Sequence, residues 1–201
     1  MKLIIRFIVL LLLLLNTSVQ AQSLNNKINN AVQSVQDSIR DVVEASASEI
    51  DKDANTALAM LREEISDSSL IIDQAYGYLV FPRIVKVGVG IGIETGEGVL
   101  RINDLSVDYY RLSSGSLGFQ LGAQAKGVVV AFMTQDILNN FRNNPGWKVG
   151  VDGSITIIDQ GLGKSIDTDN ILDPIVAFVF DNRGLMYSLT MEGTIFNLIS
   201  K

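Results

Sequence analysis

The stretch VKVGVGIGIE, Val85–Glu94, alternates without interruption between aliphatic residues and residues that are mostly glycine. Alternate residues of a β-strand point to opposite faces, so the pattern predicts a strand that is aliphatic on one face and bare at Gly88, Gly90 and Gly92 on the other. Glycine weakens a strand by about 0.5–1 kcal/mol relative to alanine. We therefore expect a helix or a second layer of the domain to lie closely over the bare face, or the strand to bend sharply there.

Alternation of the same kind continues towards the C-terminus and predicts at least eight strands, which follow two helices. Turns are expected at TGEG, residues 95–98, and at SSGS, residues 113–116, and Pro82 is expected to end an earlier strand. The continuous apolar run Val128–Met133 predicts a strand buried on both faces, and Thr134 is expected to cap a short inserted helix. The fold class expected is α+β, with a curled, mostly antiparallel sheet or sandwich.

Apolar residues before the strands recur at helical spacing and form one stripe: Leu24, Ile28, Val32, Val35, Ile39 and Val42. This spacing predicts an amphipathic helical extension over residues 22–50, either lying on a membrane surface or packing on its own domain. Its polar positions carry only Lys27 and Arg40 as cations. A second helix is expected to follow, capped by Asp51 or Asp53.

The first 21 residues, MKLIIRFIVLLLLLLNTSVQA, combine a basic start, an apolar core and a small-residue neck. The core is shorter than the roughly 20 residues that span a bilayer, so we expect a signal peptide that is cut after Ala21. A retained anchor is the alternative. The chain has no cysteine, so it cannot be acylated as a lipoprotein, and a secreted chain without cysteine favours a bacterial periplasm. The expected organisation is signal peptide 1–21, helical extension 22–50 and domain 51–201.

Composition argues against several classes of function. Without residues 1–21 the chain keeps 14 basic and 22 acidic residues, a net charge of −8, which is unsuited to binding nucleic acid through phosphates. It has no histidine and no cysteine, which removes the usual general base, thiolate nucleophile and zinc ligands. The aspartates at residues 167–173 do not follow the order of an EF-hand. We therefore expect no catalytic residues, no metal and no cofactor.

Five basic residues lie in the strand region: Arg83, Lys86, Arg101, Arg111 and Lys126. They are either ordinary surface residues or a local patch that holds a lipid phosphate. The candidate lipid-binding residues are Arg83 and Lys86, the glycines Gly88, Gly90 and Gly92, and the stripe residues Val32, Val35 and Ile39.

Three blocks of sequence resemble the SYLF domain family in their order along the chain. They are AYGYLVFPRIVKVGVGIGIETGEGVL (75–100), GSLGFQLGAQAKGVVVAFMTQDILNNF (115–141) and GWKVGVDGSITI (146–157). The resemblance covers about residues 51–201, and DPIVAFVFDNRGLMYSLTMEGTIF (173–196) is similar to the bacterial, secreted branch.

This resemblance implies lipid binding without catalysis. Eukaryotic relatives bind phosphoinositides through basic residues, here Arg83 and Lys86, and through an amphipathic helix before the domain, here residues 24–43. In fungi the domain is known as actin-binding, which we do not expect of a periplasmic chain. The function expected is a non-catalytic periplasmic module that binds lipid or a membrane surface, with an acyl chain sharing the glycine-rich groove. The alternative is a structural or stress-related envelope protein without a lipid ligand, whose groove is filled by its own helix.

Overall fold

The computed structural model describes residues 22–23, 25–27, 29–30, 33, 37, 40, 44–159, 173–184 and 191–201, but not the side chains of residues 88–91, 116–123 and 183–184. The chain forms two compact units, Met1–Ser38 and Ile39–Lys201. In the first unit every described residue is helical, as the spacing predicts. The expected signal peptide and the six apolar stripe residues lie outside the described residues.

The elements of the second unit are α2 (Ala47–Glu64), α3 (Ser68–Ile72), β1 (Gly77–Ile102), β2 (Leu105–Phe132), α4 (Gln135–Asn143), β3 (Gly146–Lys148), β4 (Thr156–Asp159), β5 (Ile175–Gly184) and β6 (Ile195–Ile199). The described strands form one sheet in the order β3-β6-β2-β5-β4, with β1 also paired to β2. Every pair is antiparallel except β4 with β5. The predicted α+β class with a curled, mostly antiparallel sheet is confirmed.

Strands β1 and β2 form one long hairpin. The turns predicted at residues 95–98 and 113–116 are wrong, because both segments stay paired within these two strands. The turn is made by Asn103 and Asp104, whose φ angles of 50° and 62° suit a two-residue hairpin. The expected stop at Pro82 is wrong as well, because the strand passes it with a shift in register. Such a shift tolerates proline, which cannot donate to the ladder.

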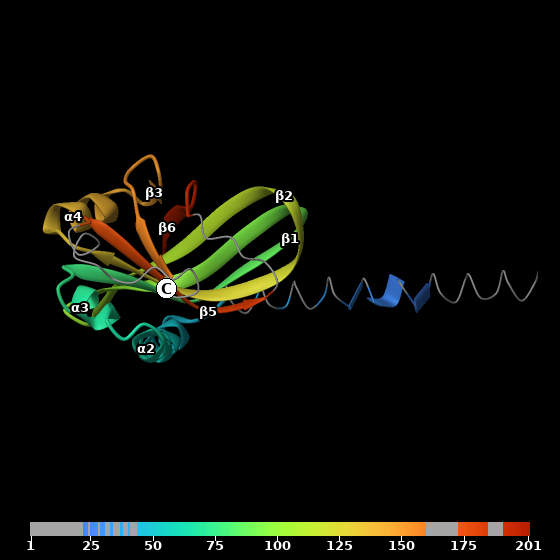
Figure 1. Cartoon of the computed structure of the whole chain (residues 1–201), viewed down its shortest axis with the longest axis horizontal. Helices are drawn as coiled ribbons and strands as arrows, with labels where there is room; N and C mark the ends of the chain where they lie inside the picture. Colours follow the sequence, from blue (N-terminus) through green and yellow to red (C-terminus); the bar gives the residue numbers. More distant parts are fainter. Residues whose placement is uncertain are drawn as a thin grey trace, which may run out of the picture. The chain divides into compact units, whose positions relative to one another are not determined.

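The hairpin curves back over itself, as Figure 1 shows for β1 and β2. A Cβ built on Gly98 would lie 2.3 Å from the carbonyl oxygen of Val80, and one on Gly96 would lie 2.7 Å from that of Arg83. The second half of β1 therefore packs against the first half so closely that only glycine fits. The reversal falls between them, around residues 88–92, where the pairing register also shifts. The sharp bend that the sequence left open as an alternative accounts for this arrangement.

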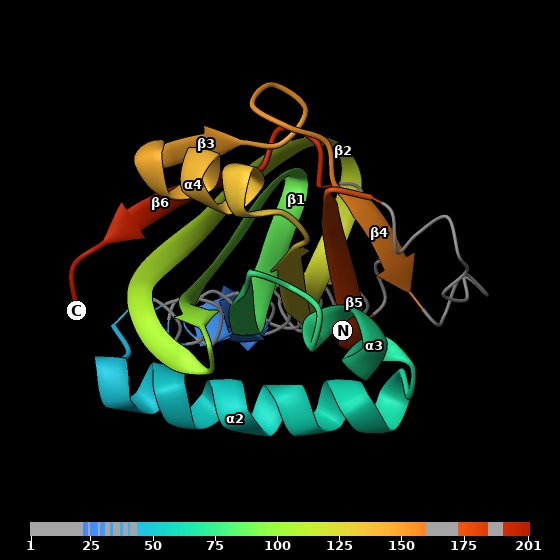
Figure 2. The same cartoon turned by 90° about the vertical axis from the view of Figure 1, so that its left-hand side faces the viewer.

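The curled sheet buries both of its faces. Inner-facing residues of both halves of the hairpin share one core, which includes Phe81, Leu112 and Val130. The other face packs under α2, which contributes Ile50, Ala54, Ala57, Leu58 and Leu61, and Figure 2 shows α2 running along one side of the sheet, with α4 on the other. Successive residues of the apolar run at the end of β2, from Val128 to Phe132, lie alternately in these two cores. The prediction that this strand is buried on both faces is therefore confirmed.

The start of α2 differs from the prediction. Ser46 is the N-cap, and its hydroxyl accepts a hydrogen bond from the Glu49 amide at 3.3 Å. The Glu49 carboxylate accepts from Ser46, and these bonds lower the pKa of Glu49. The expected cap at Asp51 or Asp53 is wrong, because the helix begins one turn earlier with a complete capping box. Asp51 instead accepts a hydrogen bond from the Tyr109 hydroxyl at 3.1 Å, which joins the helix to β2.

Helix α4 closes one end of the inner core. Thr134 caps it as predicted, since its hydroxyl accepts from the Ile137 amide at 3.3 Å. Leu138 and Phe141 are the buried residues of the helix. The ring of Phe141 lies among four other aromatic rings, which makes it a centre of the core.

Candidate functional site

Near the reversal of the hairpin, three strands bring distant segments of the chain onto one outer face. The pairing register places two rows side by side across β1, β2 and β6: Thr95–Ser113–Ile195 and Glu97–Arg111–Asn197. Next to the first row, Ile93 of β1 lies opposite Gly115 of β2. Side chains two residues apart on a strand share a face, so these positions form a continuous surface.

A hollow of about 450 Å³ lies on this surface. Its apolar lining includes Ile93 and Ile195, and its hydroxyl groups come from Thr95, Ser113 and Ser114. Ile93 is 59 % exposed.

Two glycines keep the hollow open. Gly115 and Gly193 both line it, and no atom lies within 4 Å of a Cβ built on either. At Gly96 and Gly98 the missing side chain admits backbone from the other half of β1. At Gly115 the missing side chain leaves space instead.

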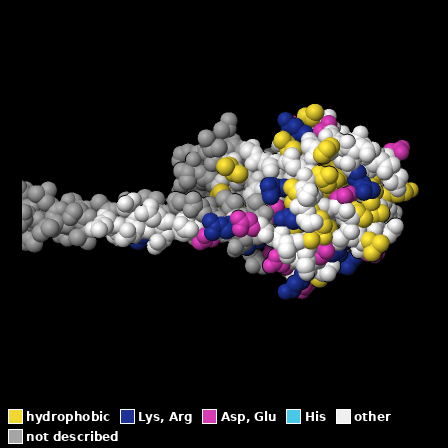
Figure 3. Space-filling model, turned by 180° about the vertical axis from the view of Figure 1, so that it is seen from behind, with side chains coloured by type: hydrophobic (Ala, Val, Ile, Leu, Met, Phe, Trp, Pro, Cys, Tyr) yellow, Lys and Arg dark blue, Asp and Glu magenta, His cyan; other side chains and the backbone are white. Residues whose placement is uncertain are grey.

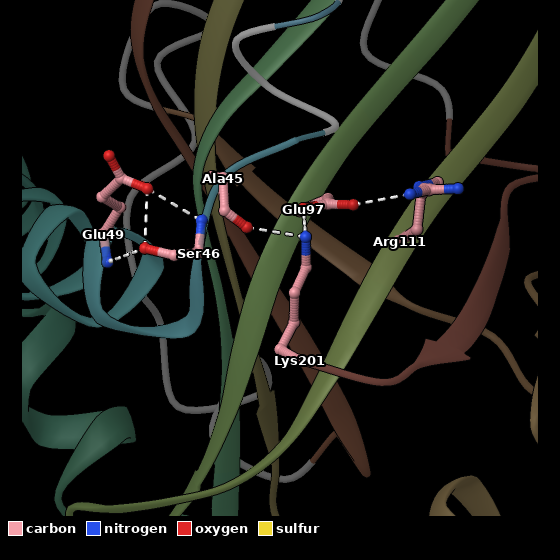
Figure 4. Close-up of polar contacts among 6 residues, drawn as sticks. All are labelled: Ala45, Ser46, Glu49, Glu97, Arg111 and Lys201. Atoms are coloured by element: carbon pink, nitrogen blue, oxygen red, sulfur yellow. Dashed lines mark hydrogen bonds and ion pairs between the residues drawn. The ribbon is translucent and has the colours of Figure 1, made fainter.

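Arg111 is the cation of the hollow, and it is held in place by a buried carboxylate. Its Nη2 donates to Glu97 Oε1 at 2.7 Å, and the Glu97 side chain is 1 % exposed. Lys201 Nζ lies 2.6 Å from the other oxygen of Glu97 and donates to the carbonyl of Ala45 at 2.7 Å (Figure 4). One carboxylate is thus shared by two basic side chains. Among the described residues, the buried Nε of Arg111 has no hydrogen-bond partner.

The structure separates the two basic residues expected to bind a headgroup. Arg83 is exposed, whereas Lys86 is only 5 % exposed. Lys86 lies opposite Gln124 in the register, and neighbouring Lys126 is buried in an ion pair with Glu94 at 2.8 Å. A headgroup at the surface can therefore meet Arg83 directly, but not Lys86.

The remaining predicted site residues are described only in part. Gly92 is buried, while the surroundings of Gly88 and Gly90 lie outside the side chains that the structure describes. Val32, Val35 and Ile39 lie outside the described residues altogether.

The five basic residues of the strand region do not form one patch. Arg101 is buried and donates to Asn55 of α2 at 2.7 Å, so its role is to hold the helix on the sheet. Lys86 and Lys126 are also buried. Of the five, Arg111 alone lines the hollow. The sequence identifies Arg111 as a candidate but not Ser113 or Gly115, because it predicts a turn at these two residues.

The described surface is mixed in character. Figure 3 shows hydrophobic side chains interspersed with single charged ones over the face in view. In the part of the chain that the structure describes, no helix combines the length and apolar character needed to cross a bilayer. The same residues contain no group of three or more acidic, histidine or cysteine side chains placed to hold a metal ion.

Comparison with known proteins finds a family match over part of the chain. Residues 113–198 match the model of the Ysc84 family, described as "Las17-binding protein actin regulator", which corresponds to the SYLF domain. The match begins at Ser113, inside β2, and ends in β6. It therefore includes Ser113, Gly115 and Ile195 of the hollow. No curated protein matches the chain. Family members are in general binding modules for lipid or actin. Residues 113–198 of the chain therefore match the SYLF (Ysc84) family, in agreement with the resemblance that the sequence predicts.

Proposed function

We propose that the mature chain is a non-catalytic module of the bacterial cell envelope that binds lipid or a membrane surface from the periplasm. The observation that carries this proposal is the hollow, where the exposed Ile93 and the partly buried Ile195 lie in one lining with an arginine. This combination suits an amphiphile better than a purely polar ligand, because it offers an apolar contact and a charged one side by side. Actin, named in the description of the family, is not expected as a partner in a periplasm.

We further propose that the amphipathic stripe of residues 24–42 provides most of the attachment to a bilayer. Burying apolar surface contributes about 25 cal/mol per Å². A surface ion pair contributes only about 0–1 kcal/mol and weakens with salt. The mature chain carries a net charge of −8 and its helical extension has few cations, so apolar contact should exceed charge attraction.

Co-sedimentation with phosphatidylethanolamine–phosphatidylglycerol vesicles tests this proposal on the full mature chain. Binding should persist when salt is raised about tenfold from 0.05 M, although the Debye length falls about threefold. It should weaken strongly in the double variant Val32→Asp, Val35→Asp. The matched control is Asn30→Asp, Gln33→Asp, which adds the same charge on the opposite side of the helix and should leave binding nearly unchanged.

Two outcomes would contradict the proposal. Binding that vanishes with salt but is unaffected by the valine changes would assign attachment to exposed cations such as Arg83. A folded chain that neither sediments with vesicles nor carries co-purified lipid in mass spectrometry would favour the structural envelope protein instead.

The periplasmic location depends on removal of residues 1–21. We expect the mature protein to begin at or near Gln22, because the apolar core is short and the neck ends in Val-Gln-Ala. N-terminal sequencing of the protein isolated from periplasmic extract checks this. A protein that retains Met1 in the membrane fraction would show that the segment is an anchor.

A further inference from the structure

We propose that the hollow between β1, β2 and β6 binds one single-chain anionic amphiphile, with its head on Arg111 and its chain over Ile93 and Ile195. This rests on the proposed lipid-binding function but goes beyond it, because it assigns a residue-level site separate from the helical extension. The ligand class is an acyl chain that ends in a carboxylate or phosphate.

The position of the ligand's head group is inferred from the hydrogen-bond donors of Arg111 that Glu97 does not use. Glu97 engages only Nη2, and the Arg111 side chain lines the hollow and is 37 % exposed, so part of the guanidinium is open to a ligand. A guanidinium presents its donors as a planar fork that fits a carboxylate or phosphate with two parallel bonds.

The charge balance of the site favours an anion. Glu97 is shared between Arg111 and Lys201, at 2.7 and 2.6 Å, so two basic side chains meet one carboxylate there. Glu94 also lines the hollow, but it is paired with Lys126 at 2.8 Å and its side chain is only 10 % exposed. The hydroxyls of Thr95 and Ser113 add donors that suit an oxyanion.

The chain is assigned from the apolar part of the lining. Ile93 and Ile195 lie on either side of Ser113 and Gly115, on strands that flank β2. Without a ligand, Ile93 is 59 % exposed. An acyl chain lying across Gly115 would cover it, whereas free phosphate would leave it in water.

Two variants test the site by isothermal titration calorimetry of the full mature chain with laurate and dodecyl phosphate below their micelle concentrations. Gly115→Leu places a side chain in open space at an ordinary backbone φ, so it should fill the hollow and weaken binding about tenfold or more without lowering the melting temperature. Arg111→Lys keeps the charge but loses the fork, and should weaken binding about tenfold.

Each variant has a matched control. Gly146→Leu also enters open space, on β3 beyond β6, and should leave affinity unchanged. Arg142→Lys alters an arginine of similar exposure, 41 % against 37 %, that pairs with Asp108 at 3.0 Å, and it too should bind normally. Inorganic phosphate and dodecyltrimethylammonium should bind at least about tenfold more weakly than laurate.

Several results would overturn the assignment. Laurate binding that is absent in the wild type, or unchanged in Gly115→Leu and Arg111→Lys, would show that the hollow is not the site. Equal binding of inorganic phosphate would indicate a site for free anions, and equal binding of the cationic amphiphile would remove the role of Arg111. Vesicle binding through the helical extension could survive all of these results, so the two proposals can fail separately.

Discussion

A Gly98→Val variant is expected to lose about 3 kcal/mol or more of its free energy of unfolding, or to fail to fold. A Cβ at this position would lie 2.3 Å from the carbonyl oxygen of Val80 and 2.6 Å from the ring of Phe81. The first of these atoms is backbone, so it cannot swing away as a flexible side chain could. The two halves of β1 would have to move apart, which opens the core between them. Urea denaturation followed by circular dichroism measures the loss.

Gly115→Val is the control for that experiment. It makes the same substitution in the partner strand, but a Cβ built on Gly115 has no atom within 4 Å. Its free energy of unfolding should stay within about 0.5 kcal/mol of the wild type, as for other substitutions at exposed positions. Should Gly98→Val prove as stable as Gly115→Val, the close packing of β1 on itself would be refuted.

A Phe141→Ala variant is expected to lose about 3–5 kcal/mol, the usual effect of removing a large buried aromatic side chain. The Phe141 ring is fully buried, with centroids 4.7 Å from Phe132, 4.8 Å from Tyr110, 5.8 Å from Trp147 and 5.9 Å from Phe196. Removing it leaves a cavity among rings that belong to different elements and cannot all move in to fill it. The urea midpoint and the near-ultraviolet signal of Trp147 should both fall.

Val151→Ala provides the comparison for Phe141→Ala. Val151 is 71 % exposed, so its truncation should change stability by less than about 0.5 kcal/mol. A loss below about 1 kcal/mol for Phe141→Ala would mean that α4 is not packed on the core as described.

The parts of the fold that the sequence predicted correctly depend on local rules. The apolar run at Val128–Met133 has no polar face, and the structure indeed buries it on both sides. Thr134 precedes a helix and has a side chain that can accept from its first free amides, and it caps α4. In both cases the residues that decide the outcome are neighbours in the chain.

The long hairpin could not be predicted because the same glycine pattern is found in turns and in strands that pack closely on other backbone. Gly96 and Gly98, within TGEG, suggest a turn, since glycine permits unusual backbone angles. Here they admit backbone from the other half of β1 instead. The choice between turn and close packing depends on residues 80–84, which no local pattern connects to them.

The candidate site could not be predicted from sequence patterns either, because its residues are far apart in the chain. Ile93, Arg111 and Ile195 share a surface only through the pairing of β2 with both β1 and β6. Arg111 could be identified as one of several cations, but its distinction from buried Arg101 and Lys86 arises from burial and ion pairing. Side-chain partners of this kind are set by tertiary structure.

The folded-over hairpin also determines how the domain comes apart. In an ordinary β-sandwich each strand belongs to one sheet, so the sheets could in principle separate along the plane between them. Here β1 and β2 run through both halves of the curled sheet, and β2 pairs with β6 near one end and with β5 near the other. Among the described strands there is therefore no plane along which one half could detach while keeping its own ladders intact. Slow amide exchange in the two halves should therefore be lost together, in a single cooperative opening.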